Sequence, residues 1–468
     1  MKRNTIAICV VALATGLVSA NAFATEPAGK PNVLFIAIDD LNDWVGHLGG
    51  HPDAKTPHID RLAQRGVSFT NAHCAAPACN PSRAALLSGL RPSTSGIYQN
   101  PHDWVNTLAD VTTLPQFYRQ QGYLVLGGGK IFHGSARADK YFDDYYRRKE
   151  LPPPKTPYNG LGLAHFDWKA IDVTEEEMPD YKLVSWAADV LNKPSDKPLF
   201  LAVGIVKPHL PWYAPQKYFD MYPKDQITLP DVPDDDLDDV PPIGLRMANP
   251  TRDHKAVTDA DQWRDAVQAY LATNSFVDDQ VGRLIDALDR SPRANNTVIV
   301  LWGDHGWHLG EKQHWRKFTL WEEATRAPLI FAAPRMTKPG VLCSRPVDFM
   351  SIYPTLADLC GLPIPDHVEG ASLCPLLEAP DTAWDRMALT THGRGEHGVR
   401  CDRWRYIRYH DGTEELYDHA SDPMEWTNVA AKPEHAELKE QMGKWIPKNE
   451  VPNAPVAGGY KKRSRSKR

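Results

Sequence analysis

The first long apolar stretch of the chain reads Asn32-Val33-Leu34-Phe35-Ile36-Ala37-Ile38-Asp39-Asp40. Residues 33–38 contain no polar side chain, which is typical of a strand buried on both faces of a parallel sheet. The run ends abruptly in two aspartates. Because open α/β sheets bind ligands beyond the carboxyl ends of their strands, we expect Asp39 and Asp40 to lie at a functional site.

Three later stretches repeat this pattern of an apolar run followed by charged or imidazole side chains. Any one ending could be an ordinary loop, but four endings of the same kind predict one shared site at an edge of a sheet. The later runs and the residues that follow them are 123–126 with Lys130 and His133, 199–206 with Lys207 and His209, and 297–302 with Asp304 and His305.

The rest of the chain predicts helices between these strands and a different architecture near the C-terminus. Apolar residues recur at helical spacing over 263–288, and the Asp- and Pro-rich segment 230–242 predicts a surface loop. Residues 404–409 alternate with a period of two, Asp411-Gly412 offers a turn, and 414–417 can form a second strand. We therefore expect a small α+β subdomain with an antiparallel hairpin.

The composition of the 468 residues fits a large globular protein, with 42% hydrophobic residues and a formal net charge of −6. Eight basic residues lie at the two ends; without them, 45 basic residues face 59 acidic ones, a charge of −14. Such an acidic body argues against a nucleic-acid binder. The basic C-terminal tail could contact a polyanion or a membrane surface, but such tails are more often disordered and solvated.

The N-terminus has the pattern of a secretory signal peptide. Lys2 and Arg3 precede an apolar run over 6–18, and Ala22-Phe23-Ala24 supplies a small-x-small cleavage site. A short membrane anchor is the alternative, but the run is too short to span comfortably and no stop-transfer pattern follows. We predict cleavage after Ala24 and an exported protein without an integral membrane span.

These patterns predict four segments: a signal peptide (1–24), a large N-terminal α/β domain (25–380), a C-terminal α+β subdomain (381–455) and a basic tail (456–468). Export permits disulfides, although the cysteine spacing is not that of a disulfide-dense scaffold. Cys9 would leave with the signal peptide. Six cysteines then remain; if one of them is consumed by a modification, five are left, and at least one should be a free thiol or pair between chains.

The most informative motif is Cys79-Asn80-Pro81-Ser82-Arg83-Ala84-Ala85-Leu86-Leu87-Ser88-Gly89. Pro81 suits the first turn of a helix, and the residues that follow Arg83 are good helix formers. Cys79 would then lie at a helix N-terminus, where free N–H groups favour an anion, and Arg83 adds a cation one turn later. On its own, Cys79 could equally be a buried thiol, a disulfide partner or an unmodified nucleophile.

This motif resembles the signature of the type I sulfatases, which belong to the alkaline-phosphatase-like superfamily. The resemblance extends from Pro31 to the hairpin near Tyr417. It implies that Cys79 is converted to Cα-formylglycine by a maturation enzyme. It also implies an α/β fold with a large mixed, mainly parallel sheet flanked by helices, and a smaller C-terminal subdomain that contains an antiparallel sheet.

The expected substrate chemistry calls for a metal ion. A sulfate ester is an anion, so a hard divalent cation with oxygen ligands must help to neutralise it before an oxygen nucleophile attacks. The resemblance assigns Ca²⁺ binding to Asp39, Asp40, residue 79, Asp304 and His305. The family commonly has Asp-Asn or Asp-Gln at the last pair, whereas Asp304-His305 resembles the iduronate-2-sulfatase branch. The alternative is that His305 only hydrogen-bonds a ligand.

The resemblance to that branch also implies roles for four further residues. Lys130 and Lys317 would hold sulfate oxygens, His133 would contact the formylglycine hydroxyl, and His209 would face the leaving oxygen as general acid. Lys207 inherits no role and is expected to face solvent. A substrate pocket could be lined by Trp307, His308, Trp315 and Arg316, with core packing as the alternative for the two tryptophans.

The sequence therefore predicts a sulfatase that acts on a sulfated saccharide, such as a 2-O-sulfated uronate. A phosphodiesterase or phosphonate hydrolase of the same superfamily and an inactive glycan-binding protein are the alternatives. We expect a periplasmic or secreted bacterial protein rather than a lysosomal one. Its one glycosylation sequence without proline, Asn295-Asn296-Thr297, abuts a predicted buried strand, which is a poor place for a glycan.

Overall fold

The computed structural model describes residues 29–134, 138–334 and 336–458. The predicted signal peptide and the basic residues of the tail, from Lys461 onward, lie outside the described residues. Residues 456 and 457, which the sequence assigned to the tail, are held in place: Val456 forms a β-bridge with His102, and the Ala457 N–H donates to the carbonyl of Pro101 at 2.9 Å.

Within these residues, eight strands form the main sheet, in the order β13-β2-β12-β9-β1-β7-β4-β5. The strand β12 runs antiparallel to both of its neighbours, and the other pairs are parallel. The strands are β1 (Asn32–Ile38), β2 (Val67–Phe69), β4 (Leu124–Gly129), β5 (Asp144–Tyr146), β7 (Leu199–Ile205), β9 (Thr297–Gly303), β12 (Leu329–Ala332) and β13 (Val341–Cys343).

The continuous apolar run of β1 is explained by two cores, one on each face of the sheet. Leu34, Ile36 and Ile38 belong to one core, while Val33 and Phe35 belong to the other. Successive side chains of a strand point to opposite faces, so a strand covered on both faces must be apolar at every position. The prediction of a mixed, mainly parallel sheet flanked by helices is confirmed.

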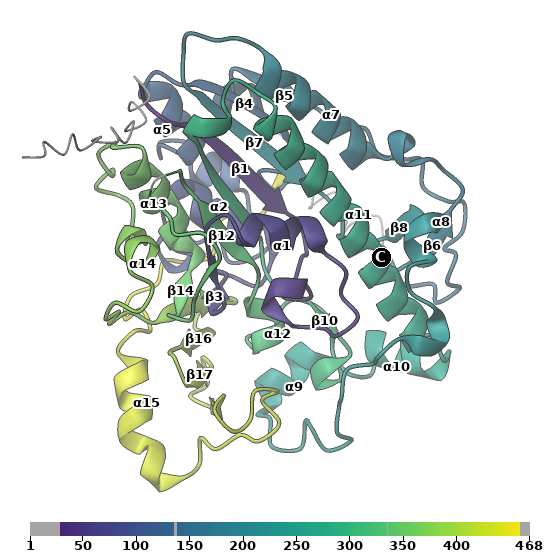
Figure 1. Cartoon of the computed structure of the whole chain (residues 1–468). Helices are drawn as coiled ribbons and strands as arrows, with labels where there is room; N and C mark the ends of the chain where they lie inside the picture. Colours follow the sequence, from purple (N-terminus) through teal and green to yellow (C-terminus); the bar gives the residue numbers. More distant parts are fainter. Residues whose placement is uncertain (1–28, 135–137, 335, 459–468) are drawn as a thin grey trace, which may run out of the picture.

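Helices cover both faces (Figure 1). The first core includes α1 (Pro57–Ala63), α7 (Pro179–Asn192) and α11 (Trp263–Asp289), which matches the helix predicted over 263–288. The second core includes α2 (Cys79–Ser88), α5 (Leu114–Gln120) and α13 (Ile352–Leu359). The other helices are α3 (Pro92–Ser95), α4 (Trp104–Thr107), α6 (Ala138–Tyr141), α8 (Gln216–Phe219), α9 (Pro242–Ala248), α10 (Asp253–Asp259), α12 (Glu322–Thr325), α14 (Cys374–Glu378) and α15 (Ala436–Gly443).

The glycines after residue 126 belong to strand β4, whereas the sequence suggested that they follow it. A Cβ on Gly128 would lie 2.7 Å from Leu183, and one on Gly129 would meet the carbonyl oxygen of Gly204. Gly129 also has a φ of 77°, which favours glycine. The strand therefore continues through these glycines because its neighbours leave no room for side chains.

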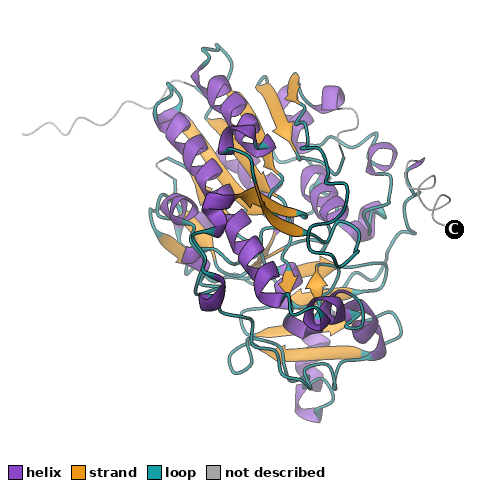
Figure 2. Ribbon diagram, turned by 90° about the vertical axis from the view of Figure 1, so that its right-hand side faces the viewer, coloured by secondary structure: helices purple, strands orange, loops and turns teal. Residues whose placement is uncertain are grey.

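A separate antiparallel sheet lies below the main sheet in Figure 2. Its four strands pair in chain order, and the last two form the hairpin predicted around Asp411-Gly412. Three two-stranded ladders complete the described strands. The four strands are β15 (Ala388–Thr391), β16 (His397–Arg400), β17 (Trp404–Arg408) and β18 (Glu414–Asp418), and the ladders pair β3 (Ala72–His73) with β14 (Val347–Asp348), β6 (Trp168–Ile171) with β8 (Trp212–Pro215), and β10 (His308–Leu309) with β11 (Trp315–Arg316).

The small sheet is fixed to the main body by backbone pairing and by buried ions. The Thr391 N–H donates to the carbonyl of Ala75 at 2.9 Å, next to the segment that leads into Cys79. Arg405 of β17 is buried, contacts Glu322 of α12, and lies 2.6 Å from Glu425. In the described parts of the chain, no helix combines the length and apolarity needed to cross a lipid bilayer.

We predict that Arg405→Ala lowers the stability of the protein by about 3–5 kcal/mol, because the buried Glu322 and Glu425 lose the cation that they share. The measurement is the shift of the thermal unfolding transition. Arg403→Ala is the matched control, since Arg403 is more than half exposed and its pair with Asp418 lies at the surface. Equal shifts for the two variants would contradict the buried role of Arg405.

Candidate active site

The four predicted strand endings meet at one edge of the main sheet. The strands β4, β7, β1 and β9 are consecutive and parallel, so the residues that follow them gather at the same end. The helix α2 begins at Cys79 and brings its N-terminus to this edge, as the position of Pro81 predicted. Sequence segments more than 200 residues apart therefore form one charged cluster.

Arg83 holds the centre of this cluster. Its buried guanidinium lies 2.8 Å (Nε) from Asp304 and 3.3 Å (Nη2) from Asp39, which links the ends of β9 and β1. Its Nη1 donates to the carbonyl oxygens of Lys130 and Ile131. Burial opposes the charged form, but Asp304 and Asp39 outweigh it and raise the pKa of Arg83. The guanidinium is therefore a permanent cation with every neighbour fixed by the fold.

The three carboxylates respond differently to burial. Burial alone would raise the pKa of Asp39, but Lys130, with His209 and Arg83, holds the pKa of this carboxyl well below its usual range. Arg83 similarly keeps the pKa of Asp304 low against the effect of burial. The pKa of Asp40 is raised, because burial and the charge of Asp39 outweigh Lys317.

Asp40 is the most constrained of the three. It has a φ of 63°, a left-handed conformation in which aspartate is one of the better tolerated residues. Its N–H donates to Asp304 at 2.9 Å, and its carbonyl accepts from the hydroxyl of Tyr270 at 2.8 Å. Among the described residues, its buried Oδ2 atom has no hydrogen-bond partner. Buried polar atoms usually have a hydrogen-bond partner, so this oxygen is free to bind a ligand.

Cys79 faces this group directly. Its Sγ lies 3.0 Å from Lys317 Nζ, 3.4 Å from His305 Nε2 and 3.7 Å from Asp40 Oδ1. Burial raises the pKa of the thiol despite the nearby lysines, so the sulfur stays protonated at neutral pH. An unmodified Cys79 is thus a poor nucleophile. All six described cysteines are free thiols, so within this part of the chain none pairs in a disulfide.

The donor atoms can hold a metal ion. Two overlapping groups have ligand atoms within 4.8 Å of one another: Asp39, Asp40, Cys79 and His209, and Asp40, Cys79, Asp304 and His305. Three carboxylates and the unpartnered Oδ2 atom of Asp40 suit a hard divalent cation, which prefers oxygen ligands. The residues present therefore fit the predicted metal, and all of the predicted ligands lie in these two groups.

The two predicted acid–base histidines border the same cluster. His209 Nε2 lies 4.0 Å from Asp40 Oδ2, and burial, with Lys130 and Lys317, lowers its pKa to about 3. Burial and Lys130 likewise lower the pKa of the half-buried His133 to about 3. Both rings are therefore neutral in the free site, where each can accept a proton but must first gain one before it can donate.

Lys207 was expected to face solvent, and this expectation was wrong. The residue is only 9% exposed, and its ammonium donates to the carbonyl oxygens of His209 and Pro211. The carbonyl groups of the following loop turn toward this ammonium. The sequence pattern gave no sign of this, because it does not show where carbonyl groups point.

The four residues suggested for a substrate pocket are engaged inside the protein. Trp307 and Trp315 are buried in the first core, which matches the core-packing alternative. His308 is buried with hydrogen bonds at both ring nitrogens, and Arg316 lies 2.6 Å from Asp253. Trp307 still touches the site, since Lys317 Nζ lies 5.1 Å from the centre of its ring.

Sequence reasoning missed two supporting residues. Tyr270 counted only as an apolar position of the predicted helix, but its hydroxyl binds the backbone of both Asp40 and Asn42. Ser82 donates to the carbonyl of Asp304. Ser82 belongs to the quoted motif and could have been found from it, whereas nothing in the sequence marks Tyr270.

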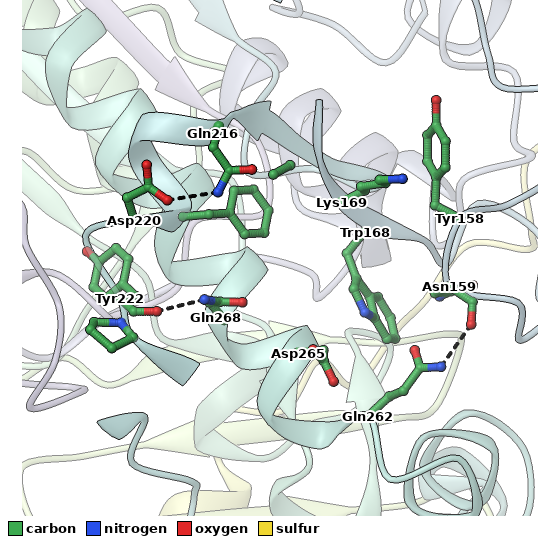
Figure 3. Close-up of a pocket in the computed structure, with 13 residues that line it drawn as sticks. Tyr158, Asn159, Trp168, Lys169, Gln216, Asp220, Tyr222, Gln262, Asp265 and Gln268 are labelled. Carbon is green, nitrogen blue, oxygen red and sulfur yellow. Dashed lines mark hydrogen bonds between the residues drawn. The ribbon is translucent and has the colours of Figure 1, made fainter. Parts of the chain in front are cut away.

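A cleft of about 720 Å³ lies elsewhere, between β6, α8 and α11 (Figure 3). Amide and aromatic side chains such as Gln216, Gln268 and Tyr158 line it, and none of the predicted site residues does so. Trp168 of this cleft stacks on Trp212, which packs against Tyr270 and Trp307 in the first core. The candidate site at the strand ends therefore lies outside this cleft.

Comparison with known proteins decides the family. The family model described as sulfatase matches residues 31–362. The chain belongs to the sulfatase family. A second family model describes the C-terminal region of N-sulphoglucosamine sulphohydrolase. It matches residues 310–451, which include the small sheet of this sulfatase. Both matches agree with the alkaline-phosphatase-like fold described above.

Individual relatives support the same assignment. A sulfatase of Formosa agariphila is 43% identical over 425 residues, which cover 86% of this chain and 83% of that protein. Iduronate 2-sulfatase of Homo sapiens is 33% identical over 390 residues, which cover 71% of this chain and 70% of that protein. The structure of a phosphonate monoester hydrolase of Agrobacterium radiobacter has a TM-score of 0.73 at 23% identity, covering 89% of this chain and 94% of that one, and shows a shared fold.

We predict that the metal-depleted sulfatase binds one Ca²⁺ per chain in isothermal titration calorimetry. Asp40→Asn should weaken this binding by more than about 10-fold, because it removes the carboxylate shared by both ligand groups. Asp259→Asn is the matched control, since that carboxylate is exposed and pairs with Lys255. Unchanged binding in Asp40→Asn would contradict the site.

Proposed function

We propose that this protein is a formylglycine-dependent sulfatase that removes sulfate from a saccharide, with a 2-O-sulfated uronate as its substrate unit. The observation that carries the proposal is the position of Cys79. It begins α2 and faces Asp40, His305 and Lys317. Its protonated thiol is a poor nucleophile, while oxidation to an aldehyde would supply a hydrated oxygen nucleophile at the same place.

The charge of the site supports an anionic substrate. Asp39, Asp40 and Asp304 balance Arg83, Lys130 and Lys317 in formal charge. A divalent cation held by Asp39, Asp40, residue 79, Asp304 and His305, for which we propose Ca²⁺, would make the group positive. When bound, the ion would supply electrostatic stabilisation of negative charge on the sulfate oxygens and on the nucleophile.

The hydrated formylglycine would provide the hydroxyl that attacks sulfur. Around it, Lys130 and Lys317 would hold sulfate oxygens and disperse the negative charge of the transition state. Arg83 keeps the carboxylates in place through its contacts with Asp39 and Asp304. His133 would accept a proton from the second hydroxyl of residue 79, so that sulfate can leave and the aldehyde returns.

His209 would donate a proton to the oxygen of the leaving alcohol. Its pKa of about 3 in the free site leaves it unprotonated, because its partly buried ring loses solvation and lies beside Lys130 and Lys317. A bound sulfate ester adds negative charge beside Lys130 and Lys317, which offsets their effect and favours the protonated ring. Substrate binding would therefore charge His209 at the moment when its proton is needed.

The relatives and the N-terminal sequence support the proposed substrate and cellular setting. Iduronate 2-sulfatase, at 33% identity, supports a 2-O-sulfated uronate. We propose export to the periplasm or beyond a bacterial cell, in line with the N-terminal pattern and with the sulfatase of Formosa agariphila. A formylglycine-generating enzyme would be the partner that converts Cys79.

We predict that the mature enzyme releases sulfate fastest from an oligosaccharide with a 2-O-sulfated uronate at its end. The panel should also contain 6-O-sulfated hexosamine, an aryl sulfate, an aryl phosphate and a phosphonate ester, with released anion as the readout. Cys79→Ala should lower kcat by several orders of magnitude, because the nucleophile is removed. Cys401→Ala, a cysteine of the small sheet's loop, should retain activity.

The panel also tests the alternatives. Faster turnover of the phosphate or phosphonate ester than of every sulfate ester would favour the phosphodiesterase or phosphonate hydrolase. Binding of sulfated saccharides without release of sulfate by protein with converted residue 79 would favour an inactive glycan-binding protein. Full turnover by Cys79→Ala would refute the proposed chemistry.

A further inference from the structure

The loop after β7 contains a buried cation that the proposed chemistry does not use. Lys207 is 9% exposed, and its ammonium lies 3.2 Å from the carbonyl oxygen of His209 and also contacts that of Pro211. Burial lowers the pKa of Lys207 to about 8, although Asp180 opposes this effect. A buried ammonium is costly unless its donors are satisfied, so its two carbonyl partners indicate a specific role.

The start of the same loop is held by a carboxylate. Asp180, at the beginning of α7, is buried and accepts the N–H groups of Val206 at 3.1 Å and Lys207 at 3.0 Å. Its position is fixed in turn by Arg148, whose Nε lies 2.9 Å away. Asp180 thus fixes the loop where it leaves the sheet, and Lys207 fixes the part that follows.

His209 lies between these two anchors. Its N–H donates to the carbonyl of Val206 at 2.9 Å, and its own carbonyl accepts from Lys207. Its ring Nδ1 lies 2.6 Å from the carbonyl oxygen of Leu210 and must carry the proton of that hydrogen bond. Nε2 is therefore the nitrogen that faces Asp40, at 4.0 Å.

We propose that Lys207 is a positioning residue that sets the direction of His209 Nε2 toward the leaving oxygen of the substrate. The Leu210 carbonyl accepts the hydrogen bond that orients the imidazole. Along the chain, Leu210 stands between His209 and Pro211, whose carbonyls bind Lys207. This inference rests on the proposed role of His209 as general acid. In that step the proton moves from Nε2 to the alcohol oxygen as the S–O bond breaks, and Lys207 exchanges no proton.

The dependence of turnover on the leaving group separates this role from a merely structural one. A nitrophenolate leaves without protonation, whereas a sugar alkoxide needs a proton. Loss of fold or of residue 79 conversion would slow both substrates equally. Misdirection of His209 would slow only the saccharide.

The experiment compares kcat/KM for 4-nitrophenyl sulfate and for the saccharide sulfate that the wild-type enzyme prefers. Lys207→Met should lower the saccharide value by roughly 10²-fold, the scale of a misplaced catalytic group, and the nitrophenyl value by only a few-fold. Lys207→Arg, which keeps a cation, should recover part of the loss. Lys217→Met is the matched control, because Lys217 is more than half exposed on α8.

His209→Ala provides the reference. It should show the same selective loss, and the double variant with Lys207→Met should lose little more, because both changes disable one step. An equal loss on the two substrates, or an unchanged ratio in folded Lys207→Met, would overturn the role. If Lys207→Met does not fold, Lys207→Gln, which keeps two N–H donors, provides the same comparison.

The two proposals fail in different ways. A wild-type enzyme that releases no sulfate from any ester refutes the proposed function itself. A wild-type enzyme that hydrolyses both esters, with variants whose ratio does not change, refutes only the role of Lys207.

Discussion

The buried bridge from Arg83 to Asp39 and Asp304 is the interaction on which the site depends. It joins the carboxyl ends of β1 and β9 to α2, one helical turn after Cys79. A buried ion is tolerated only when its charge is balanced and its hydrogen-bond donors have acceptors. For Arg83, two carboxylates and two backbone carbonyls meet these needs. The bridge therefore fixes where the helix begins relative to the sheet, and with it the position of residue 79.

This arrangement also explains how an acidic protein can act on anionic esters. The three carboxylates and three nearby cations balance in formal charge, so a bound divalent cation would make the cluster positive. The low-dielectric surroundings then strengthen attraction for a sulfate group over short distances. The overall charge of −6 acts on the surface and does not determine the potential inside this pocket.

Much of the site followed from the sequence because a simple rule applied. Parallel strands that neighbour one another must present their carboxyl ends together, so Asp39, Lys130, His209 and Asp304 were expected to meet, and they do. Pro81 and the alanines after it predicted the helix that starts at Cys79. The resemblance to sulfatases then gave these residues their expected roles.

The remaining features depend on packing that no local pattern encodes. The burial of Lys207 depends on where the carbonyls of His209 and Pro211 point. The support of Asp40 by Tyr270 depends on the docking of a helix 230 residues away along the chain. Trp307 and Trp315 follow Asp304 and His305 in the sequence, yet both are buried in the first core.

The central claim is that residue 79 works as an oxygen nucleophile and not as a thiol. Mass spectrometry of the peptide that contains residue 79, from enzyme made in a host with a maturation system, tests it most directly. The account predicts the mass of formylglycine and its hydrate in the active protein. An active protein that carries only the unmodified cysteine would contradict it.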